Sequence, residues 1–453
     1  MFIERPFYLK ELIQSQGNGM VKILTGPRRC GKSFLLFHIF KDYLLKSGIK
    51  ENQIIEVDLE NSLNIALTNP LKLSAFLRAK IEANNGKKTF VFIDEIQLCK
   101  SVKNPAFSKD DLPEGTPFPL VTFYDVLNGL ISSFNNVETY VTGSNSHMLS
   151  TDIATEFRGR GWQIPVHPLT FSEYVRNRIN PDLFKLWDEY YRFGGLPACS
   201  LYPDIPSKRK YLLDVFNATY LKDVIDCYSL RRETRIVDLT KVVASTTGSL
   251  VNFSKISNTF SSSEHESIST NTIKSYLSYL EDAFLISKVE RYDVKGRQNI
   301  GGLAKYYFCD VGLRNAALGF KEEKEETHLM ENVVYNELIA RGYNVNVGVV
   351  ESRETVNGKQ VSKHYEVDFV ADKGGPRFYI QCALYIPDEE KMRQEKESFK
   401  KIGDSFTKIL ITKYSSGISY DEDGILHVSL FDFLLKPEIL NDSTLKGTID
   451  LTD

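Results

Sequence analysis

The sequence has 453 residues, too many for one hydrophobic core of ordinary size, so about two to four domains are expected. Hydrophobic residues make up 42% of the chain, charged residues make up 25%, and the formal net charge is -3, which is typical of a soluble globular protein. This balance excludes binding to nucleic acid or to an anionic membrane through overall charge, and leaves only local patches for such partners.

Cysteine spacing and the apolar pattern indicate the compartment. The six cysteines are scattered without a CxxC pair, which favours reduced thiols over a disulfide framework. Residues 1–12 lack the apolar core of a signal peptide, and no apolar run approaches the ~20 residues that span a bilayer. We therefore expect a cytoplasmic protein that does not enter a membrane.

The first 168 residues alternate between apolar runs and helical patterns. Four runs have the length and composition of buried strands: VKILTG (21–26), QIIEVDLE (53–60), KTFVFIDE (88–95) and VETYVTGS (137–144). Helical patterns between them predict an α/β fold with a parallel sheet covered by helices. The segment 100–119 is rich in Pro, Lys and Asp and is interpreted as a surface insertion.

The first strand leads into GPRRCGKS, which fits the pattern G-x-x-x-x-G-K-[ST]. The glycines let backbone N–H groups point at phosphate oxygens, and the following helix adds its positive end. The lysine reaches the β- and γ-phosphates, and the serine hydroxyl binds Mg²⁺. A plain glycine turn is the alternative. We predict a P-loop ATPase core over 1–168, with ATP and Mg²⁺ as cofactors. The predicted nucleotide-binding residues are Gly26, Pro27, Arg28, Arg29, Cys30, Gly31, Lys32 and Ser33.

The third predicted strand ends in two acidic residues, Asp94 and Glu95. A buried strand that delivers a carboxylate to the end of the sheet can hold Mg²⁺ through Asp94, and Glu95 can polarise the attacking water. The alternative is an ordinary strand with an acidic turn. Next to a P-loop, we predict Asp94 and Ser33 as metal ligands and Glu95 as the catalytic base.

The fourth strand and the segment after it supply further catalytic candidates. Ser144 and Asn145 are predicted to lie beside the γ-phosphate and to position water. Arg158 and Arg160 are predicted to stabilise charge on the γ-phosphate, either in cis or from a neighbouring subunit of a homo-oligomer. The plain alternatives are a Ser/Asn turn for the first pair and surface salt bridges for the arginines.

Together, GPRRCGKS, FIDEIQ, VTGSNS, FRGR and PLTFSEY resemble the bacterial and archaeal AAA-like ATPases of the additional-strand class, whose cellular roles are largely unassigned. The stretches FGGLP (193–197), KYYFCDVGLRNA (305–316) and EVDFVA (366–371) are similar to the C-terminal region that accompanies this ATPase. The resemblance covers nearly the whole chain. It implies an additional-strand P-loop core, a winged-helix segment and a nuclease-like C-terminal fold, and it implies no substrate.

The middle of the chain is predicted to be mainly helical. Residues 169–235 carry helical and aromatic patterns and are expected to form a helical lid. In 236–320, two helical patterns (253–260 and 269–286) precede a ribbon that ends near residue 310. Helix, turn, helix and ribbon predict a winged-helix-like segment.

The charge of the ribbon bears on DNA binding. From Lys288 to Lys305 there are five basic residues against two acidic ones. Contact between the ribbon and DNA phosphates is therefore one expectation. The alternative is that the segment only packs the domains together.

Residues 321–453 return to a mixed α/β pattern. The turn KGGP (373–376) joins two alternating strands, and centring the turn between its glycines places Asp368 opposite Gln381. A helical pattern upstream contributes Glu331. These features predict an α/β domain built around a hairpin with polar residues on one face.

A helix Glu, a strand Asp and a following [Glu/Gln]-x-Lys form the layout of PD-(D/E)xK nucleases, in which carboxylates hold Mg²⁺ and lysine supports the attacking water. Glu331, Asp368 and Gln381 match it, but Ala383 stands where lysine is expected. We therefore predict a PD-(D/E)xK-like domain with a vestigial site and weak or absent cleavage. A polar hairpin without a site is the alternative.

Three functions remain open from the sequence. The first is a Mg²⁺-dependent ATPase whose hydrolysis changes the conformation of the C-terminal modules, with DNA as a candidate target. The second is an ATP-gated switch or scaffold that hydrolyses slowly and has no DNA role. The third is an ATP-regulated nuclease, which Ala383 disfavours. Glu95 favours the first, because a pure binder has no need of a water-polarising acid.

Overall fold

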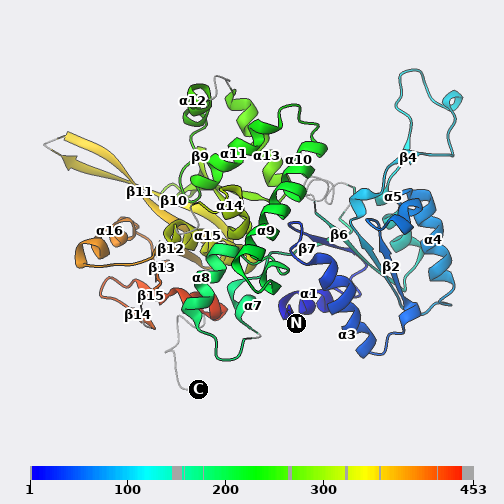
Figure 1. The fold of residues 1–453 in the computed structure, drawn as a ribbon, viewed down its shortest axis with the longest axis horizontal. Coiled ribbons are helices and arrows are strands. Elements are labelled where there is room, and N and C mark those ends of the chain that lie inside the picture. The colour runs from blue at the N-terminus through cyan, green and yellow to red at the C-terminus, as the bar shows by residue number, and fades with distance from the viewer. Residues whose placement is uncertain are drawn as a thin grey trace. The chain divides into compact units, whose positions relative to one another are not determined.

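The computed structural model describes residues 3–144, 156–157, 159–176, 178–263, 268–321, 325–356, 359–415 and 417–440. It forms two compact units (Figure 1). The first comprises Met1–His167 with Asp282–Phe284, and the second comprises Pro168–Glu281 with Leu285–Asp453. Within these described ranges, every helix is too short or too polar to cross a membrane.

The first unit contains a five-stranded sheet in the order β2-β3-β6-β1-β7, with every pair parallel. Strand β6 lies between β1, which precedes the P-loop, and β3, which ends at Asp94, as the resemblance to additional-strand ATPases implies. The strands are β1 (Val21–Thr25), β2 (Ile54–Asp58), β3 (Thr89–Asp94), β6 (Val137–Gly143) and β7 (Gly161–Pro165). The predicted α/β class and parallel sheet are confirmed.

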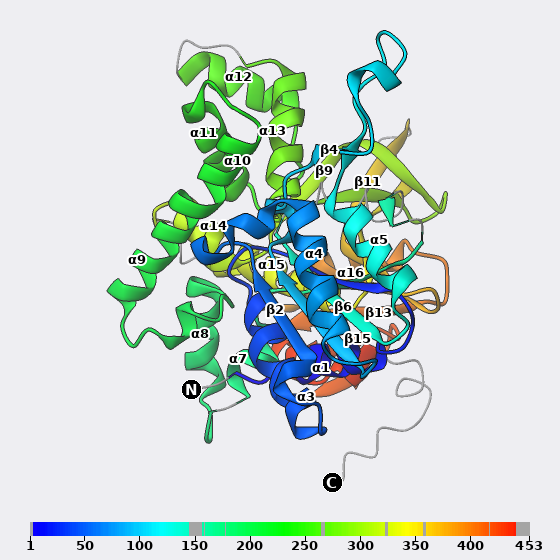
Figure 2. The same ribbon diagram turned by 90° about the vertical axis from the view of Figure 1, so that its right-hand side faces the viewer.

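Alternation along β3 shows how helices cover both faces of this sheet. Phe90 and Phe92 point into a core that also holds side chains of α1 and of the helix after the P-loop. Val91 and Ile93 point to the opposite core, where α4 and α5 pack side by side (Figure 2). A parallel strand buried on both faces is a continuous apolar run, which explains TFVFI. The helices are α1 (Pro6–Gln14), α2 (Lys32–Phe34), the π-helical η1 (Leu35–Phe40), α3 (Lys41–Lys46), α4 (Pro70–Glu82) and α5 (Phe123–Ser133).

The predicted insertion at 100–119 forms a mostly exposed arm that projects from this unit (Figures 1 and 2). Its two ends pair as short antiparallel strands, β4 (Val102–Lys103) and β5 (Leu120–Val121). The remaining short helices of the first unit are η2 (Glu51–Gln53), η3 (Ser62–Thr68), η4 (Ile96–Leu98) and η5 (Lys109–Asp111).

The second unit is built on a mixed eight-stranded sheet in the order β14-β15-β13-β12-β11-β10-β8-β9. Its long central ribbon, β10–β11, extends away from the rest of the unit (Figure 1). The strands are β8 (Ile286–Asp293), β9 (Gln298–Phe308), β10 (Asn344–Val356), β11 (Lys359–Asp372), β12 (Arg377–Ala383), β13 (Thr407–Thr412), β14 (Ile418–Tyr420) and β15 (Leu426–Ser429).

The helices of the second unit come from the predicted segments 169–235, 236–320 and 321–453. They are α7 (Phe171–Val175), α8 (Leu183–Phe193), η6 (Cys199–Leu201), α9 (Ile205–Val215), η7 (Phe216–Leu221), α10 (Lys222–Cys227), α11 (Glu233–Ser245), α12 (Phe253–Ser263), α13 (Thr270–Asp282), α14 (Val311–Ala317), α15 (Glu326–Ala340), α16 (Glu389–Lys400), α17 (Leu430–Leu435) and η8 (Pro437–Leu440). Side chains of α7 and α8 share one hydrophobic core with α15 and with strands β9, β11, β12 and β13.

The ribbon of the predicted winged-helix segment is part of this sheet. Its two strands, β8 and β9, pair with each other, and β8 also pairs in parallel with β10 of the predicted 321–453 domain. The helices α12 and α13 precede the ribbon at the predicted positions. The predicted segments 169–235, 236–320 and 321–453 thus contribute to a single compact unit, because the ribbon completes a sheet and does not stand as a free wing.

The FGGLP and CDVGLRN stretches surround a buried carboxylate in this unit. Asp310 accepts hydrogen bonds from the backbone N–H groups of Gly195 (2.6 Å) and Leu313 (3.1 Å). A Cβ on Gly194 would lie 2.1 Å from Asp310 Oδ1, and the φ of Gly194 is +72°, so only glycine fits there. Burial raises the pKa of Asp310 to about 6, although these N–H groups oppose the shift. The two stretches therefore hold α8 and α14 together.

Candidate active site

The loop after β1 has the backbone geometry that its two glycines predict. Gly26 has a φ of +142°, and a Cβ there would lie 2.0 Å from the carbonyl oxygen of Val166. Gly31 has a φ of +98° and lies at the start of α2. Both positions require glycine, because an L side chain is strained at a positive φ. The loop thus delivers the chain to a helix N-terminus, where backbone N–H groups can bind an anion.

Lys32 crosses the mouth of this loop. Its Nζ donates hydrogen bonds to the carbonyl oxygens of Gly26 and Pro27, each at 2.9 Å, and only 4% of the residue is exposed. The ammonium is therefore held over the loop that would carry the phosphates. The helix that begins at Lys32 continues to Lys46 through the π-helical segment η1.

Of the three residues between Pro27 and Gly31, Arg28 and Cys30 direct their side chains toward protein, and Arg29 is exposed. Arg28 forms an ion pair with Glu60 at 3.4 Å. Arg29 has a φ of +63°, the left-handed conformation of a tight turn. Cys30 is buried, and its Sγ donates to the carbonyl oxygen of Val166 at 3.3 Å. The backbone of these residues is thus left to form a phosphate cradle, while Cys30 is engaged with the protein interior.

Arg5 supports the loop from behind, a role that the sequence did not predict. Its Nη1 donates to the carbonyl oxygen of Cys30 at 3.1 Å, and its Nη2 donates to that of His167 at 2.9 Å. The guanidinium also lies 4.4 Å from the centre of the Tyr8 ring. The backbone N–H of His167 donates to the Tyr8 hydroxyl at 3.0 Å. Arg5 therefore joins the start of the chain, the P-loop and the end of β7.

Asp94 lies at the end of β3, beside the P-loop serine. Its Oδ1 accepts hydrogen bonds from the hydroxyls of Ser33 (2.9 Å) and Thr142 (2.5 Å). Burial raises the pKa of Asp94, the two hydroxyls oppose that shift, and the nearby carboxylates of Glu95 and Asp58 add to it. A hydroxyl and a carboxylate oxygen in contact at the end of a parallel sheet fit the ligand preference of Mg²⁺. The residues present are thus suited to hold this ion.

Glu95 is fixed at both its backbone and its side chain. Its φ is +49°, and its backbone N–H donates to Thr142 Oγ1 at 2.9 Å. Its Oε2 accepts hydrogen bonds from the Ser144 hydroxyl (2.8 Å) and from Gln97 Nε2. The structure thus brings together the predicted pair Glu95 and Ser144, and it adds Thr142 and Gln97. Both added residues were in quoted motifs, but only the fold shows where their side chains point.

The two predicted arginines have different outcomes. Arg160 comes just before β7, whose first residue pairs with Val21 at the amino end of β1. The P-loop follows the opposite end of β1, about 15–20 Å away at ~3.3 Å per residue. Arg160 Nη1 donates to Ser132 Oγ at 2.8 Å, on α5. A role for Arg160 in cis is therefore corrected, and only a role in trans stays a prediction. Asn145 and Arg158 lie outside the described residues.

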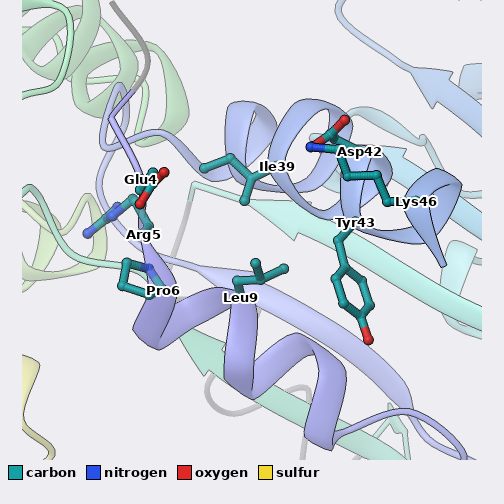
Figure 3. Close-up of a pocket in the computed structure, with 8 residues that line it drawn as sticks. All are labelled: Glu4, Arg5, Pro6, Leu9, Ile39, Asp42, Tyr43 and Lys46. Carbon is teal, nitrogen blue, oxygen red and sulfur yellow. The ribbon is translucent and has the colours of Figure 1, made fainter.

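A cavity of about 560 Å³ lies between α1 and the helix after the P-loop (Figure 3). Pro6 and Leu9 contribute apolar surface from α1, and Ile39 and Tyr43 do so from the other side. Four charged residues complete the lining: Glu4, Arg5, Asp42 and Lys46. The cavity contains none of the residues at 26–33.

In the second unit, the structure places Glu331 and Asp368 around an ammonium group that the sequence did not predict. Lys305 Nζ lies 2.9 Å from Glu331 Oε1, 2.7 Å from Glu366 Oε1 and 3.8 Å from Asp368 Oδ1. Only 2% of the Lys305 side chain is exposed. We call Lys305, Glu331, Glu366 and Asp368 the carboxylate cluster. The lysine next to these carboxylates thus comes from β9, and not from the position of Ala383, where the nuclease pattern has a lysine.

Charge and burial act together in the carboxylate cluster. Burial raises the pKa of Asp368 to about 8, the charge of Glu331 adds to this, and Lys305 opposes it. Burial alone would lower the pKa of Lys305, but the surrounding carboxylates outweigh it and raise that pKa. Glu331 also accepts a hydrogen bond from the Tyr307 hydroxyl at 2.6 Å. Lys305 therefore keeps its charge, and Asp368 holds its proton more tightly than an ordinary aspartate does.

Gln381 contacts Asp368 in a different way from the one predicted. Strands β11 and β12 have the predicted register, with Phe369 opposite Ile380. The backbone N–H of Asp368 donates to Gln381 Oε1 at 3.3 Å, and Gln381 Nε2 donates to Glu395 at 3.3 Å. The Gln381 side chain therefore joins β11 to α16. Within the described ranges no group of three or more His, Cys, Asp or Glu residues is arranged to hold a metal ion.

Comparison with known families agrees with the architecture of the chain. Residues 18–175 match the family described as "AAA domain", and residues 184–324 match the "Domain of unknown function (DUF8612)". The first unit is thus an AAA-family P-loop domain, and the second unit contains most of the region of unknown function.

The chain belongs to the same protein family as an uncharacterized protein of Haemophilus influenzae, which is 32% identical over 442 residues, or 96% of this chain and 99% of the relative. The uncharacterized protein MJ1544 of Methanocaldococcus jannaschii is 29% identical over 423 residues, or 91% of this chain and 85% of the relative. Among solved structures, the Aeropyrum pernix Orc1 protein in complex with DNA covers 75% of this chain and 94% of its own length, with 11% identity and a TM-score of 0.30. That score is too low to transfer any property.

Proposed function

We propose that this protein is a Mg²⁺-dependent ATPase that binds ATP at residues 26–33 and hydrolyses it with Glu95. The observation that carries the proposal is the junction of three strand ends. Ser33 contacts Asp94 at 2.9 Å, and Glu95 contacts Ser144 at 2.8 Å, so a P-loop hydroxyl, a metal-type carboxylate and a second carboxylate converge. The match of 18–175 to an AAA domain supports the same assignment.

Binding rests on the loop and its helix. The backbone N–H groups after Gly26 and the N-terminus of α2 attract the phosphates. Lys32 exchanges its hydrogen bonds to the Gly26 and Pro27 carbonyls for phosphate oxygens, because a charged acceptor makes a stronger hydrogen bond than a neutral one. Ser33 and Asp94 hold the metal ion. When bound, Mg²⁺ supplies positive charge to the β- and γ-phosphates.

Hydrolysis rests on Glu95. The carboxylate accepts a proton from the water that attacks the γ-phosphorus, and Ser144 and Thr142 fix its position through the side chain and the backbone. Positioned proton transfer contributes about 10²- to 10⁴-fold to a rate. The slow ATP-gated switch is the competing function. The hydrogen bonds that Ser144 and Gln97 donate to Glu95 favour the switch, because they occupy the carboxylate that would accept the water proton.

Phosphate release from Mg·ATP by the full chain tests the proposal. We expect turnover in the wild type, loss of ATP binding in Lys32→Ala, and ATP binding without turnover in Glu95→Gln. Glu82→Gln, a change of an exposed acid on α4, is the matched control and should behave as the wild type. Turnover in Glu95→Gln equal to that of the wild type would show that the assigned base is wrong.

We propose DNA as a partner only for the turn between β8 and β9. Lys295 and Arg297 are exposed there, whereas Lys288 pairs with Glu290 at 2.7 Å and Lys305 is buried in the carboxylate cluster. A winged-helix role for α12 and α13 is part of this proposal. Duplex DNA binding by the full chain at low salt should weaken in a Lys295→Glu/Arg297→Glu variant. Equal binding by both proteins would exclude this turn.

Cleavage of DNA is not part of the proposal, although Glu331 and Asp368 both lie within 4 Å of Lys305. Lys305 lies between these carboxylates, in the place where a divalent cation would have to bind. Mg²⁺- or Mn²⁺-dependent cleavage that disappears in Asp368→Ala would restore the nuclease hypothesis.

A further inference from the structure

Gln97 occupies the turn after Glu95, in the 3₁₀ helix η4. Its Nε2 donates to Glu95 Oε2 and to Ser144 Oγ, the latter at 3.2 Å. Its Oε1 is buried and has no hydrogen-bond donor among the residues that the structure describes. Gln97 therefore has one end held by two predicted catalytic residues and the other end unpaired.

The chemistry of the neighbours fixes which end of the amide is which. An ionised Glu95 carboxylate can only accept hydrogen bonds, so the amide must present its N–H group to it. The carbonyl oxygen is then left as a pure acceptor that Glu95 cannot satisfy. A buried acceptor without a donor costs free energy, and such a group in a native protein calls for a partner beyond the residues described here.

We propose that Gln97 is a positioning residue for hydrolysis, with Oε1 accepting a hydrogen bond from the attacking water while Nε2 holds Glu95. The inference rests on the proposed ATPase function and deepens it. A water molecule fits both requirements, because it can donate one hydrogen to Gln97 Oε1 and the other to the Glu95 carboxylate. Its oxygen lone pairs then remain free to attack phosphorus.

The resulting step is balanced. The water oxygen forms a bond to the γ-phosphorus, and the bond from that phosphorus to the β–γ bridging oxygen breaks. The electron pair of the broken bond stays with ADP. One water proton passes to Glu95, and Gln97 neither gains nor loses a proton. Gln97 thus increases the fraction of bound water that is aligned for attack on the γ-phosphorus, without entering the covalent chemistry.

A different role for Gln97 would have the opposite consequence. If its Nε2 only restrained Glu95 in a resting position, removing the side chain would free the carboxylate and accelerate turnover. Removing the Gln97 side chain should therefore slow turnover if Gln97 positions water, and accelerate turnover if Gln97 only restrains Glu95. Gln97→Met removes both polar atoms and keeps the length of the side chain. Gln53→Met is the matched control, because Gln53 is also a largely buried glutamine, bound to the carbonyl oxygen of Lys88 (2.7 Å) away from the site.

The first measurement is steady-state turnover of Mg·ATP by the full chain. We expect kcat to fall about 10- to 100-fold in Gln97→Met, with KM and the dissociation constant for ADP changed less than about twofold. Gln53→Met should keep the kcat of the wild type. A loss confined to kcat distinguishes positioning of water from a structural role, which would also change nucleotide binding.

The second measurement compares two analogues in the same sample. ADP with aluminium fluoride mimics the transition state with water in line, and ADP with beryllium fluoride mimics bound ATP. Gln97→Met should weaken the first about 10-fold relative to the second, because only the transition state gains from an aligned water. A partly unfolded sample affects both dissociation constants alike, so their ratio remains valid.

The outcomes separate the two proposals. A kcat or an analogue ratio in Gln97→Met equal to that of the wild type overturns the role of Gln97 and leaves the ATPase proposal intact. Faster turnover in Gln97→Met assigns Gln97 as a restraint and also overturns the inference. Absence of turnover in the wild type contradicts the ATPase proposal itself, and the role of Gln97 fails with it.

Discussion

Replacing Lys305 with methionine would test how the carboxylate cluster holds the second unit together. The substitution keeps the length of the side chain and removes the only ammonium within 4.0 Å of Glu331, Glu366 and Asp368 in the described part of the chain. Lys305 is 2% exposed, and two of its contacts are shorter than 3.0 Å. Breaking a buried ion pair of this kind costs about 3–5 kcal/mol, because Glu331 and Asp368 stay buried without a cation.

The cost should depend on pH and on divalent cations. Without Lys305 the carboxylates bind protons more tightly, so the deficit of Lys305→Met should shrink as the pH falls from 8 to 5. Mg²⁺ or Mn²⁺ should stabilise the variant more than the wild type, because a divalent cation can replace the missing ammonium.

The assay is urea unfolding followed by hydrogen exchange of amides in β9, β11 and α15, since two units need not unfold in one transition. Lys288→Met is the matched control. It removes an ion pair whose two side chains are 38% and 49% exposed, so the loss should be below about 1 kcal/mol. Equal stability of Lys305→Met and Lys288→Met would refute the assignment of Lys305 as the central cation.

Three further predictions concern single residues. Asp368 has a folded-state pKa of about 8, well above its ordinary value of 3.8. The stability that its protonated form contributes is therefore complete below about pH 4 and is lost as the pH rises through 8. Asp368→Asn should flatten this fall in unfolding free energy, and an unchanged slope would contradict the raised pKa of Asp368. Gly26→Ala should destabilise the first unit by more than about 2 kcal/mol, because its Cβ would lie 2.0 Å from the Val166 oxygen at a φ of +142°, whereas Gly129→Ala on α5, with its nearest atom at 3.7 Å, should cost nothing measurable in thermal unfolding. Arg5→Met should weaken ADP binding about 10-fold, measured by calorimetry, because the Cys30 carbonyl loses its donor; binding as tight as in the wild type would mean that the loop does not need this support.

The parts of the fold that sequence predicted depend on local patterns. Strand β3 could be recognised because Phe90, Val91, Phe92 and Ile93 form an unbroken apolar run, as parallel strands buried on both faces do. The turn at 373–376 indicated the register of β11 and β12, since a short turn of four residues leaves little choice of pairing. The loop from Gly26 to Ser33 followed from its glycine spacing.

The remainder depends on contacts between distant residues. Lys305 reaches Asp368 only because β9, β8, β10 and β11 lie in one sheet, and no pattern near Ala383 points to it. The same sheet contains strands from segments 236–320 and 321–453, which the sequence pattern predicts as separate domains. The sequence left Arg160 open between a role in cis and a role in trans, and the parallel pairing of β7 with β1 puts it at the amino end of these strands, opposite the P-loop.

Residues near the candidate site were missed for a similar reason. Gln97 was visible in FIDEIQ, but a glutamine two positions after the predicted catalytic base suggests no role until its Nε2 is seen to contact both Glu95 and Ser144. Arg5 lies 25 residues before Cys30, and only the packing of α1 brings the two together. Long-range hydrogen bonds of this kind leave no periodic signal in the sequence.

Single-turnover hydrolysis of bound ATP by Glu95→Gln is the sharpest test of Glu95 as the base that activates water. The wild type should convert bound ATP to ADP and phosphate in the presence of Mg²⁺, while Glu95→Gln should retain intact ATP at the same occupancy, with a rate lower by about 10²-fold or more. Hydrolysis of bound ATP by Glu95→Gln at the rate of the wild type would contradict the account.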